Sequence, residues 1–536
     1  MQPSDTRFFA ARTARLALSG LALATLAACA NFSGIEPTAK PLDAGTLGLK
    51  NLDASKDAEH VATDSDWWLG FGDSQLNALV QKALQDNPGL KTTQARLLRA
   101  QAASAFVKAA DGVQMNAEAD LTRQLFSANN IYPPPYGGSV LESGNLQATA
   151  SWELDFFGKN QAALDAALGQ TKATEADVQA ARGLLAANVT RNYFQLVRLQ
   201  AQLVLAQRML EQRTSIQQLV KNRVDAGLDT ALELQQAASA LPDARLQIEI
   251  LKEQQALTLN AMAALTAQPV FALKLDLPVL DNITGVRVAQ SMPLDLLGRR
   301  SDIAAARWRV EAALKDVDSA KAEFYPNINV VAFAGLNSIG FDKLLKSDSE
   351  QWGVGPAIRL PLFDGGRLRA KLRGKTAELD SAIESYNSQV LEAVHEVADR
   401  ISSSQAVRRQ QVQQGAAQAA TETAYAIALQ RYQAGLGNYL NVLSAEAPVL
   451  AQRRQGVDLA ARALDTQVQI LHALGGDIAP TLAASRAALD VPMPEAMALR
   501  TVPVSAGRSG AAVLSPKGTL APWGGPAALV APTTPN

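Results

Sequence analysis

The sequence of 536 residues contains one cysteine, three histidines and few aromatic side chains. Because Cys29 has no partner, a disulfide within the chain is impossible and a thiolate metal cluster is excluded. His60, His395 and His472 are far apart in the sequence, so we expect no metal site. The formal net charge is −1 and no basic stripe with interleaved aromatics is present, so we expect no nucleic-acid partner.

Catalytic signatures are also lacking. The sequence has no G-x-S-x-G, no Walker A motif and no H-E-x-x-H, and the "GFG" at 70–72 lacks the strand, helix and third glycine of a dinucleotide loop. We therefore expect no catalysis and no cofactor.

The N-terminus has the pattern of an export signal. Arg7, Arg12 and Arg15 precede the apolar run "LALSGLALATLAA", which is too short for an ordinary transmembrane helix. Residues 26–29, "LAAC", resemble the lipobox of bacterial lipoproteins, which implies cleavage after residue 28, palmitate on Cys29 and, with Ala30 following, sorting to the outer membrane. The alternative is a chance cysteine in an ordinary signal.

The rest of the chain repeats itself. Residues from Asn87 match those from Arg300 at an offset of 213, and "RVDAGLDTALELQQA" from Arg223 matches "RYQAGLGNYLNVLSA" from Arg431 at an offset of 208. Each copy has a short helix, two strands, a very long helix, a turn containing glycine and a second helix. We expect repeat 1 at 87–280 and repeat 2 at 281–479, after a signal peptide at 1–28 and an N-terminal segment at 29–86.

Periodicity predicts the elements of each repeat. In 145–157, apolar and polar residues alternate without a slip, which is typical of a strand with two different faces. Pro356 and Pro361 indicate an edge, a bulge or a strand end. The predicted strands are 113–124, 145–157, 327–337 and 352–363, and the predicted helices are 88–112, 160–226, 230–267, 301–325, 367–434 and 437–475.

The long helices predict an assembly larger than a globule. Segment 160–226 lacks proline and would span about 100 Å at 1.5 Å per residue. A short helix and the helix after the turn add up to nearly that length, so we expect each long helix to pack along two shorter ones placed end to end. The fold class is therefore mainly α, with long antiparallel coiled-coil helices and four strands.

Four strands cannot close a barrel, since about eight are the practical minimum. Either the sheet is half exposed to water, as many antiparallel sheets are, or several chains share one transmembrane barrel. The export signal favours the shared barrel. Two chains would give eight strands and three would give twelve, and physical reasoning alone does not choose between them.

The segment "DWWLGFGDSQLNALVQKALQDNPGL", residues 66–90, resembles the opening motif of TolC-like outer membrane factors. With "LAAC" and the duplication, the chain is similar to the lipoprotein, NodT-like branch of these efflux channels. The matching positions are Trp67, Trp68, Phe71, Asp73, Leu76, Leu79, Ala83, Asn87, Pro88 and Leu90.

The resemblance implies a homotrimer with a twelve-stranded barrel in the outer membrane and a helical tunnel in the periplasm. It also implies two partners: a periplasmic adaptor protein and an inner-membrane pump, often of the resistance-nodulation-division class. The implied function is export of small molecules. Two alternatives remain: the exit duct of a protein secretion system, and a non-conducting, lipid-anchored tether.

The resemblance also implies gate residues. Gly227 and Gly435 would be the periplasmic tips, where a turn needs positive φ or a close backbone approach. Tyr432 and Glu233 match positions that help to latch the tip closed. Asn441 and Ser444 stand where related channels have two aspartates that line the constriction, so a strongly cation-selective gate is not expected here. The alternative for these four residues is an ordinary coiled-coil surface.

Two further regions, a strand end and the C-terminal tail, also lead to predictions. Trp152, Phe156 and Phe157 are expected at the membrane interface, with Gly158 and Lys159 at the change from barrel to tunnel. The tail, 480–536, is rich in Pro, Ala and Gly and is expected to be disordered.

Overall fold

The computed structural model describes residues 32–42, 66–129, 131–283, 285–286 and 300–475. These residues belong to one compact unit, 1–483. The expected signal peptide, the lipidation site Cys29 and the tail 480–536 lie outside the described residues.

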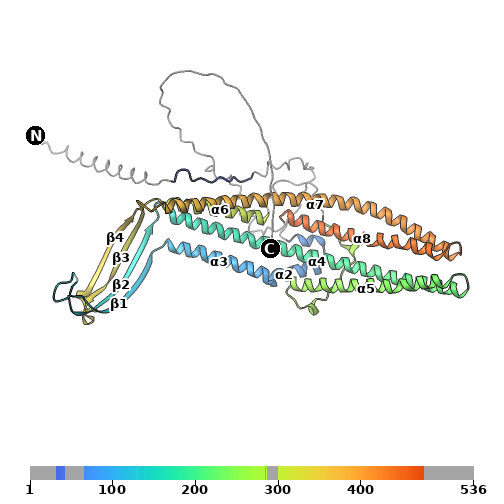
Figure 1. Ribbon diagram of the computed structural model, residues 1–536, viewed down its shortest axis with the longest axis horizontal. Helices are drawn as coiled ribbons and strands as arrows, with labels where there is room; N and C mark the ends of the chain where they lie inside the picture. Colours follow the sequence, from blue (N-terminus) through green and yellow to red (C-terminus); the bar gives the residue numbers. More distant parts are fainter. Residues whose placement is uncertain (1–31, 43–65, 130, 284, 287–299, 476–536) are drawn as a thin grey trace, which may run out of the picture. The chain divides into compact units, whose positions relative to one another are not determined.

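The described part is mainly helical (Figure 1). Among the described helices, none is long and apolar enough to cross a membrane. The helices are α2 (Ser74–Asp86), α3 (Pro88–Ala110), α4 (Lys159–Asp225), α5 (Ala231–Leu265), α6 (Ser301–Ala322), α7 (Arg367–Gln433) and α8 (Tyr439–Ala473).

The long helices α4 and α7 have 67 residues each, or about 100 Å at 1.5 Å per residue. α4 packs against α3 and α5, and α7 packs against α6 and α8, so each long helix accompanies two shorter ones (Figure 1). This confirms the predicted arrangement. α4 also contacts α6 and α8, which joins the two repeats.

Small residues permit the close contact between α4 and α6. Ala162, Ala166, Ala173 and Ala176 are buried on α4. A Cβ placed on Gly169 would lie 3.1 Å from the Cβ of Ala312 on α6, so the glycine lets the helices approach. The high alanine content therefore serves helix–helix packing rather than a thick globular core.

The opening motif builds the largest apolar cluster. Trp67, Trp68 and Phe71, on the 3₁₀ helix η3 (Trp67–Phe71), are buried with residues of α2, α4 and α8. The ring of Phe71 meets that of Phe194 on α4 edge-on, with centroids 4.9 Å apart. Asp73 caps α2 through the backbone N–H groups of Gln75 and Leu76. The motif thus attaches the start of repeat 1 to its long helix.

The four strands form one antiparallel sheet in the order β1 (Gln114–Leu125), β2 (Val140–Leu154), β3 (Asn327–Ile339) and β4 (Glu350–Arg359). Ala148 on β2 lies opposite Ala117 on β1 and Ala334 on β3, which aligns the apolar faces of the strands. The polar face carries Asn145, Gln147 and Gln351, whose side-chain amides are hydrogen-bonded. The register thus separates the two faces, as the alternation predicts.

The strand ends differ from the predicted ones. β2 begins five residues earlier than expected, at Val140, because it pairs with β1 as far as Leu125. It ends at Leu154, so Phe156 and Phe157 lie beyond the strand. β4 ends at Arg359, two residues before Pro361. Pro356 lies within β4, an edge strand of the described sheet, where its missing N–H is tolerated.

Candidate gate at the helix tips

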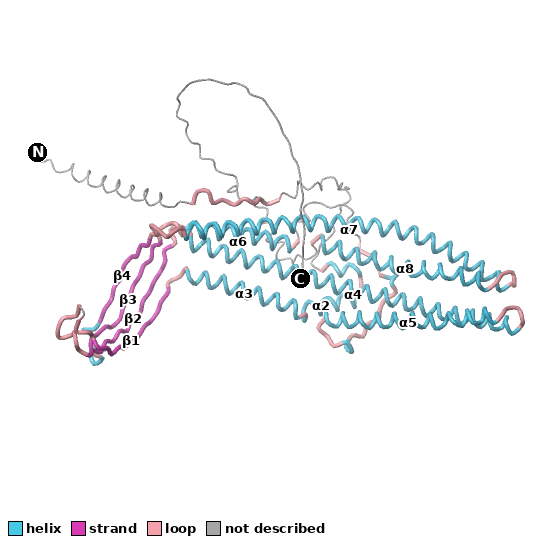
Figure 2. The backbone as a smooth tube through the Cα atoms, in the orientation of Figure 1, coloured by secondary structure: helices cyan, strands magenta, loops and turns pink. Residues whose placement is uncertain are grey.

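Two turns of the same backbone form join the long helices to the helices that follow them (Figure 2). Gly227 has φ 73° and Gly435 has φ 76°. The N–H of Leu228 donates to the carbonyl of Arg223 at 2.9 Å, and that of Leu436 to the carbonyl of Arg431 at 2.8 Å. Each glycine is thus the left-handed residue that closes a helix C-terminus. A Cβ at either glycine would meet no atom within 4 Å. Glycine is therefore required by the positive φ angle, and not because a neighbouring atom approaches closely.

Tyr432 is fully buried at this end of the helices, 0% exposed. Its hydroxyl donates to Oδ2 of Asp229 at 2.5 Å. Its ring lies 4.6 Å from the guanidinium of Arg223 and 5.9 Å from the ring of Tyr439. Tyr432 ends the long helix of repeat 2, while Asp229 and Arg223 flank the turn of repeat 1. The tyrosine therefore connects the two tips of one chain.

Arg223 holds the other side of Asp229. Its Nε and Nη2 donate to the two carboxylate oxygens at 3.0 and 3.3 Å, and its Nη1 donates to the carbonyl of Tyr432 at 3.3 Å. The two charged side chains are only 14% and 9% exposed, so solvent screens the pair weakly. We call Arg223, Asp229 and Tyr432 the tip lock.

The residues of the tip lock shift one another's pKa values. The hydrogen bond from Arg223 holds the pKa of Asp229 below its usual range. Burial, and then the hydrogen bond to Asp229, raise the pKa of Tyr432. The tip lock therefore consists of a carboxylate, a guanidinium and a neutral phenol at neutral pH.

Glu233 forms local hydrogen bonds at the start of α5, and its match to a latch position stays a prediction. Its carboxylate accepts from the backbone N–H of Thr230 at 3.0 Å and from the Thr230 hydroxyl. The threonine hydroxyl in turn caps α5, which makes a capping box. These hydrogen bonds lower the pKa of Glu233. In the described chain the acidic partner of Tyr432 is Asp229, and Glu233 starts its own helix.

Asn441 and Ser444 lie on the exposed side of α8 and make local hydrogen bonds. The N–H of Asn441 donates to Oδ1 of the helix cap Asn438 at 3.1 Å, and the hydroxyl of Ser444 donates to the carbonyl of Asn441 at 3.1 Å. Neither residue contacts the tip lock through these bonds. Their expected place at the constriction remains a proposal.

The sequence reasoning missed Asp229 and Arg223. A signal for them exists in the duplication itself. At the offset of 208, Arg223 matches Arg431 but Asp229 matches Gly437. Both copies have the arginine, but only repeat 1 has an acid six residues after it. This difference indicates that Asp229 makes a contact that is specific to the tip of repeat 1.

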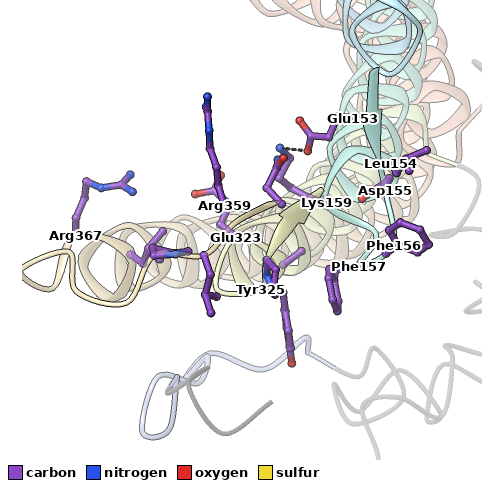
Figure 3. Close-up of a pocket in the computed structure, with 16 residues that line it drawn as sticks. Glu153, Leu154, Asp155, Phe156, Phe157, Lys159, Glu323, Tyr325, Arg359 and Arg367 are labelled. Carbon is purple, nitrogen blue, oxygen red and sulfur yellow. Dashed lines mark ion pairs between the residues drawn. The ribbon is translucent and has the colours of Figure 1, made fainter. Parts of the chain in front are cut away.

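The expected membrane-interface residues lie at the other end of the long helices. Trp152 is 45% exposed and shares the apolar face of β2 with Ala148 and Ala150. Phe156 and Phe157 follow the strand, and the ring of Phe157 stacks on Tyr325 at 4.9 Å (Figure 3). Large exposed aromatics at the end of a strand are typical of the boundary between membrane and water.

The part of the chain that the structure describes contains no candidate metal site. No group of three or more His, Cys, Asp or Glu side chains there could hold a metal ion.

Comparisons with known proteins identify the family. The model of the family described as outer membrane efflux protein matches residues 79–268 and 292–476. The multidrug resistance outer membrane protein MdtQ of Escherichia coli O6:H1 is 34% identical over 429 residues, which cover 77% of this chain and 88% of that protein. The fusaric acid resistance protein FusA of Burkholderia cepacia is 35% identical over 369 residues, which cover 68% of this chain and 69% of that protein.

Solved structures agree. The outer membrane protein VceC of Vibrio cholerae is 35% identical with a TM-score of 0.73, over 77% of this chain and 98% of that one. The outer-membrane channel OprN is 28% identical with a TM-score of 0.73, over 83% of this chain and 98% of that one. The resemblance drawn from the sequence is therefore confirmed, and the chain is an efflux channel of the outer membrane that belongs to the outer membrane efflux protein family.

Proposed function

We propose that three copies of this chain form one exit duct, with a twelve-stranded barrel in the outer membrane and a helical tunnel in the periplasm. The observation that carries the proposal is a four-stranded sheet with one apolar and one polar face, attached to helices of 67 residues. Backbone groups in lipid need partners, so the outer strands β1 and β4 would pair with those of neighbouring copies. The polar face then lines a water-filled lumen.

Cys29 would carry the lipid anchor. Because the cysteine stands at the predicted cleavage site, its acyl chains would hold the N-terminus of the mature chain in the outer membrane. Replacing it, Cys29→Ser, should abolish labelling with radioactive palmitate. Persistent labelling of the variant would contradict lipidation at this cysteine.

The tips would face the adaptor protein. Four leucines at the two turns are exposed, and they correspond pairwise at the offset of 208: Leu228, Leu232, Leu436 and Leu440. Apolar side chains at the end of an assembly suit a partner surface. The adaptor would connect the tunnel to an inner-membrane pump of the resistance-nodulation-division class. The duct itself would catalyse no reaction.

The cargo would be small molecules. Relatives are named for multidrug and fusaric acid resistance, which favours efflux over protein secretion. Deletion of the gene should raise the accumulation of a panel of drugs and organic acids, while the secreted proteins stay unchanged. Loss of secreted proteins with normal accumulation would favour the secretion duct. A purified protein that never conducts would favour the tether.

A further inference from the structure

A cavity of about 380 Å³ lies at the junction where β2 leads into α4 and β4 leads towards α7 (Figure 3). Its walls come from both repeats and are rich in charged side chains, three of them acidic. Since the tip lock is at the far end of the long helices, this cavity belongs to a separate part of the chain.

The acidic side chains of the cavity each have a partner within the chain. Glu153 forms an ion pair with Lys159, and Glu323 forms one with Lys371 at 2.5 Å. Oδ2 of Asp155 accepts from the backbone N–H of Gln161 at 2.8 Å. Two of the three acids are therefore paired with a cation, and the carboxylate of Asp155 is held by a backbone N–H group in the first turn of α4.

Two arginines of the cavity differ from these acids. Arg359 and Arg367 are exposed, and neither forms an ion pair with the residues that the structure describes. Near Arg367, the carboxylate of Asp364 accepts backbone N–H groups of Gly366 and Leu368 at 2.9 and 2.7 Å. Arg359 thus contributes the main uncompensated charge, and Arg367 adds a partly offset one.

Register places Arg359 on the polar face of the sheet. It lies opposite Asn327 on β3, in line with Asn329 opposite Ala357. Figure 3 shows the guanidinium groups of Arg359 and Arg367 on the side of Lys159, with Phe157 and Tyr325 pointing the other way. The arginines therefore face the side that lines the lumen in the proposed duct, while the aromatic pair faces outward.

Of the acids on the polar face of the strands, Glu153 lies nearest to Arg359, since it is opposite Asn329 on β3, but it is paired with Lys159. The remaining acids of this face are too far away to cancel the charge of Arg359. Glu118 and Asp120 on β1 lie opposite Gln147 and Asn145. Gln147 pairs with Gly335, eight residues along β3 from the partner of Arg359, which is about 27 Å at 3.4 Å per residue. That exceeds the screening length of about 8 Å at physiological salt.

We propose that Arg359, assisted by Arg367, forms an anion-binding ring at the junction of barrel and tunnel, which takes small organic carboxylates in transit. Guanidinium groups bind carboxylates through two parallel hydrogen bonds, and rings of arginine favour anions in pores. Three copies would place six guanidinium groups around the lumen. The inference rests on the proposed trimeric duct.

Planar bilayer recordings test the ring, with Asp229→Ala as a common background that opens the tip. In a KCl gradient, Arg359→Gln should lower the chloride-to-potassium permeability ratio about two-fold, and the double variant with Arg367→Gln further. Benzoate should block the current of the background protein and lose this effect in the double variant. Arg359→Lys, which keeps the charge, should change the ratio little.

Arg123→Gln is the matched control. Arg123 is also a strand arginine, but it pairs with Glu142 at 3.5 Å on the apolar face, so its loss should leave the ratio unchanged. A conducting double variant with an unaltered ratio and unaltered benzoate block would overturn the ring and leave the duct intact. Absence of any conductance in the Asp229→Ala background would reject both the ring and the duct. If Arg359→Gln does not assemble, Arg367→Gln alone should shift the ratio in the same direction by less.

Discussion

The four-stranded sheet and the two helix tips both arise from the internal duplication, but side chains stabilise them in different ways. In the sheet, one face of all four strands is mainly apolar, while the other face is polar chiefly on β1 and β2, and the environment of each face matters more than any single contact. At the tips, two turns of equal backbone form differ in their side chains, and one network of three residues holds both. The sheet therefore tolerates changes that respect its faces, whereas the tips depend on particular residues.

The largest effect should come from a charge on the apolar face of the sheet. Ala148→Arg puts a guanidinium halfway along β2, on the face proposed to meet lipid, and should cost about 3 kcal/mol of folding free energy. Gln147→Arg, one residue earlier on the polar face, is the matched control and should cost little. The measurement is the yield of assembled oligomer in membranes, and equal yields would refute the assignment of the faces.

Leu154 refines the same point. It is the last residue of β2 and lines the junction cavity, so it lies at the end of the strand rather than halfway along it. Because the cost of a lipid-facing arginine falls towards the interface, Leu154→Arg should cost under about 1 kcal/mol. The same yield assay ranks it against Ala148→Arg.

Removing the acid of the tip lock should have the next largest effect. Asp229→Ala leaves Arg223 and the buried hydroxyl of Tyr432 without their partner and should cost about 2 kcal/mol locally. Hydrogen exchange at the first turns of α5 and α8 should speed up. Asp225→Ala removes an exposed acid two residues before Gly227 and should leave the exchange rates unchanged.

Acid should mimic that variant. The pKa of Asp229 is lowered in the folded chain, so its contribution to stability is present above the unfolded pKa of about 3.9 and is lost as pH falls through the lower folded pKa. The pKa of Tyr432 is raised, so its contribution is present below about pH 10 and is lost at higher pH as the phenol ionises. The protection of the tip amides, measured as their exchange rate relative to that of an unstructured peptide at the same pH, should thus be highest between these limits. A protection profile that does not change with pH would contradict the tip lock.

A smaller loss is expected for Tyr432→Phe. The ring and its contact with Arg223 remain, and only the hydrogen bond to Asp229 is lost, at about 1 kcal/mol. Tyr439→Phe, on the neighbouring ring, is the control. Equal exchange rates in Tyr432→Phe and the unmodified chain would show that the hydroxyl contributes nothing.

The smallest effect sharpens the difference between the tips. Gly437 occupies the place of Asp229 in repeat 2, and a Cβ there would lie 3.7 Å from the Cβ of Arg431, an ordinary contact. Gly437→Asp should create a second ion pair with Arg431 worth about 0.5 kcal/mol. Hydrogen exchange measured during thermal unfolding of the tip would detect this gain in stability. A loss of stability in Gly437→Asp would show that the two turns are not equivalent.

Much of the fold could be predicted because its signals are periodic. The alternation of 145–157 located β2, and the proline-free runs located α4 and α7. The start of β2 was predicted five residues too late, because Val140 joins the sheet through its pairing with Leu125 rather than through its own sequence neighbours. The tip lock could not be predicted, because the contact of Asp229 with Tyr432 spans 203 residues and depends on how two hairpins pack. Glu233 fits the latch pattern but also fits a capping box, and the local hydrogen bonds formed with Thr230.

Conductance in planar bilayers tests the central claim most directly, that this chain forms a duct held closed by the tip lock. The unmodified protein should insert and conduct weakly, and Asp229→Ala should raise the single-channel conductance several-fold, while Asp225→Ala should not. Equal conductance in all three proteins would contradict the gate, and no conductance in any of them would contradict the duct.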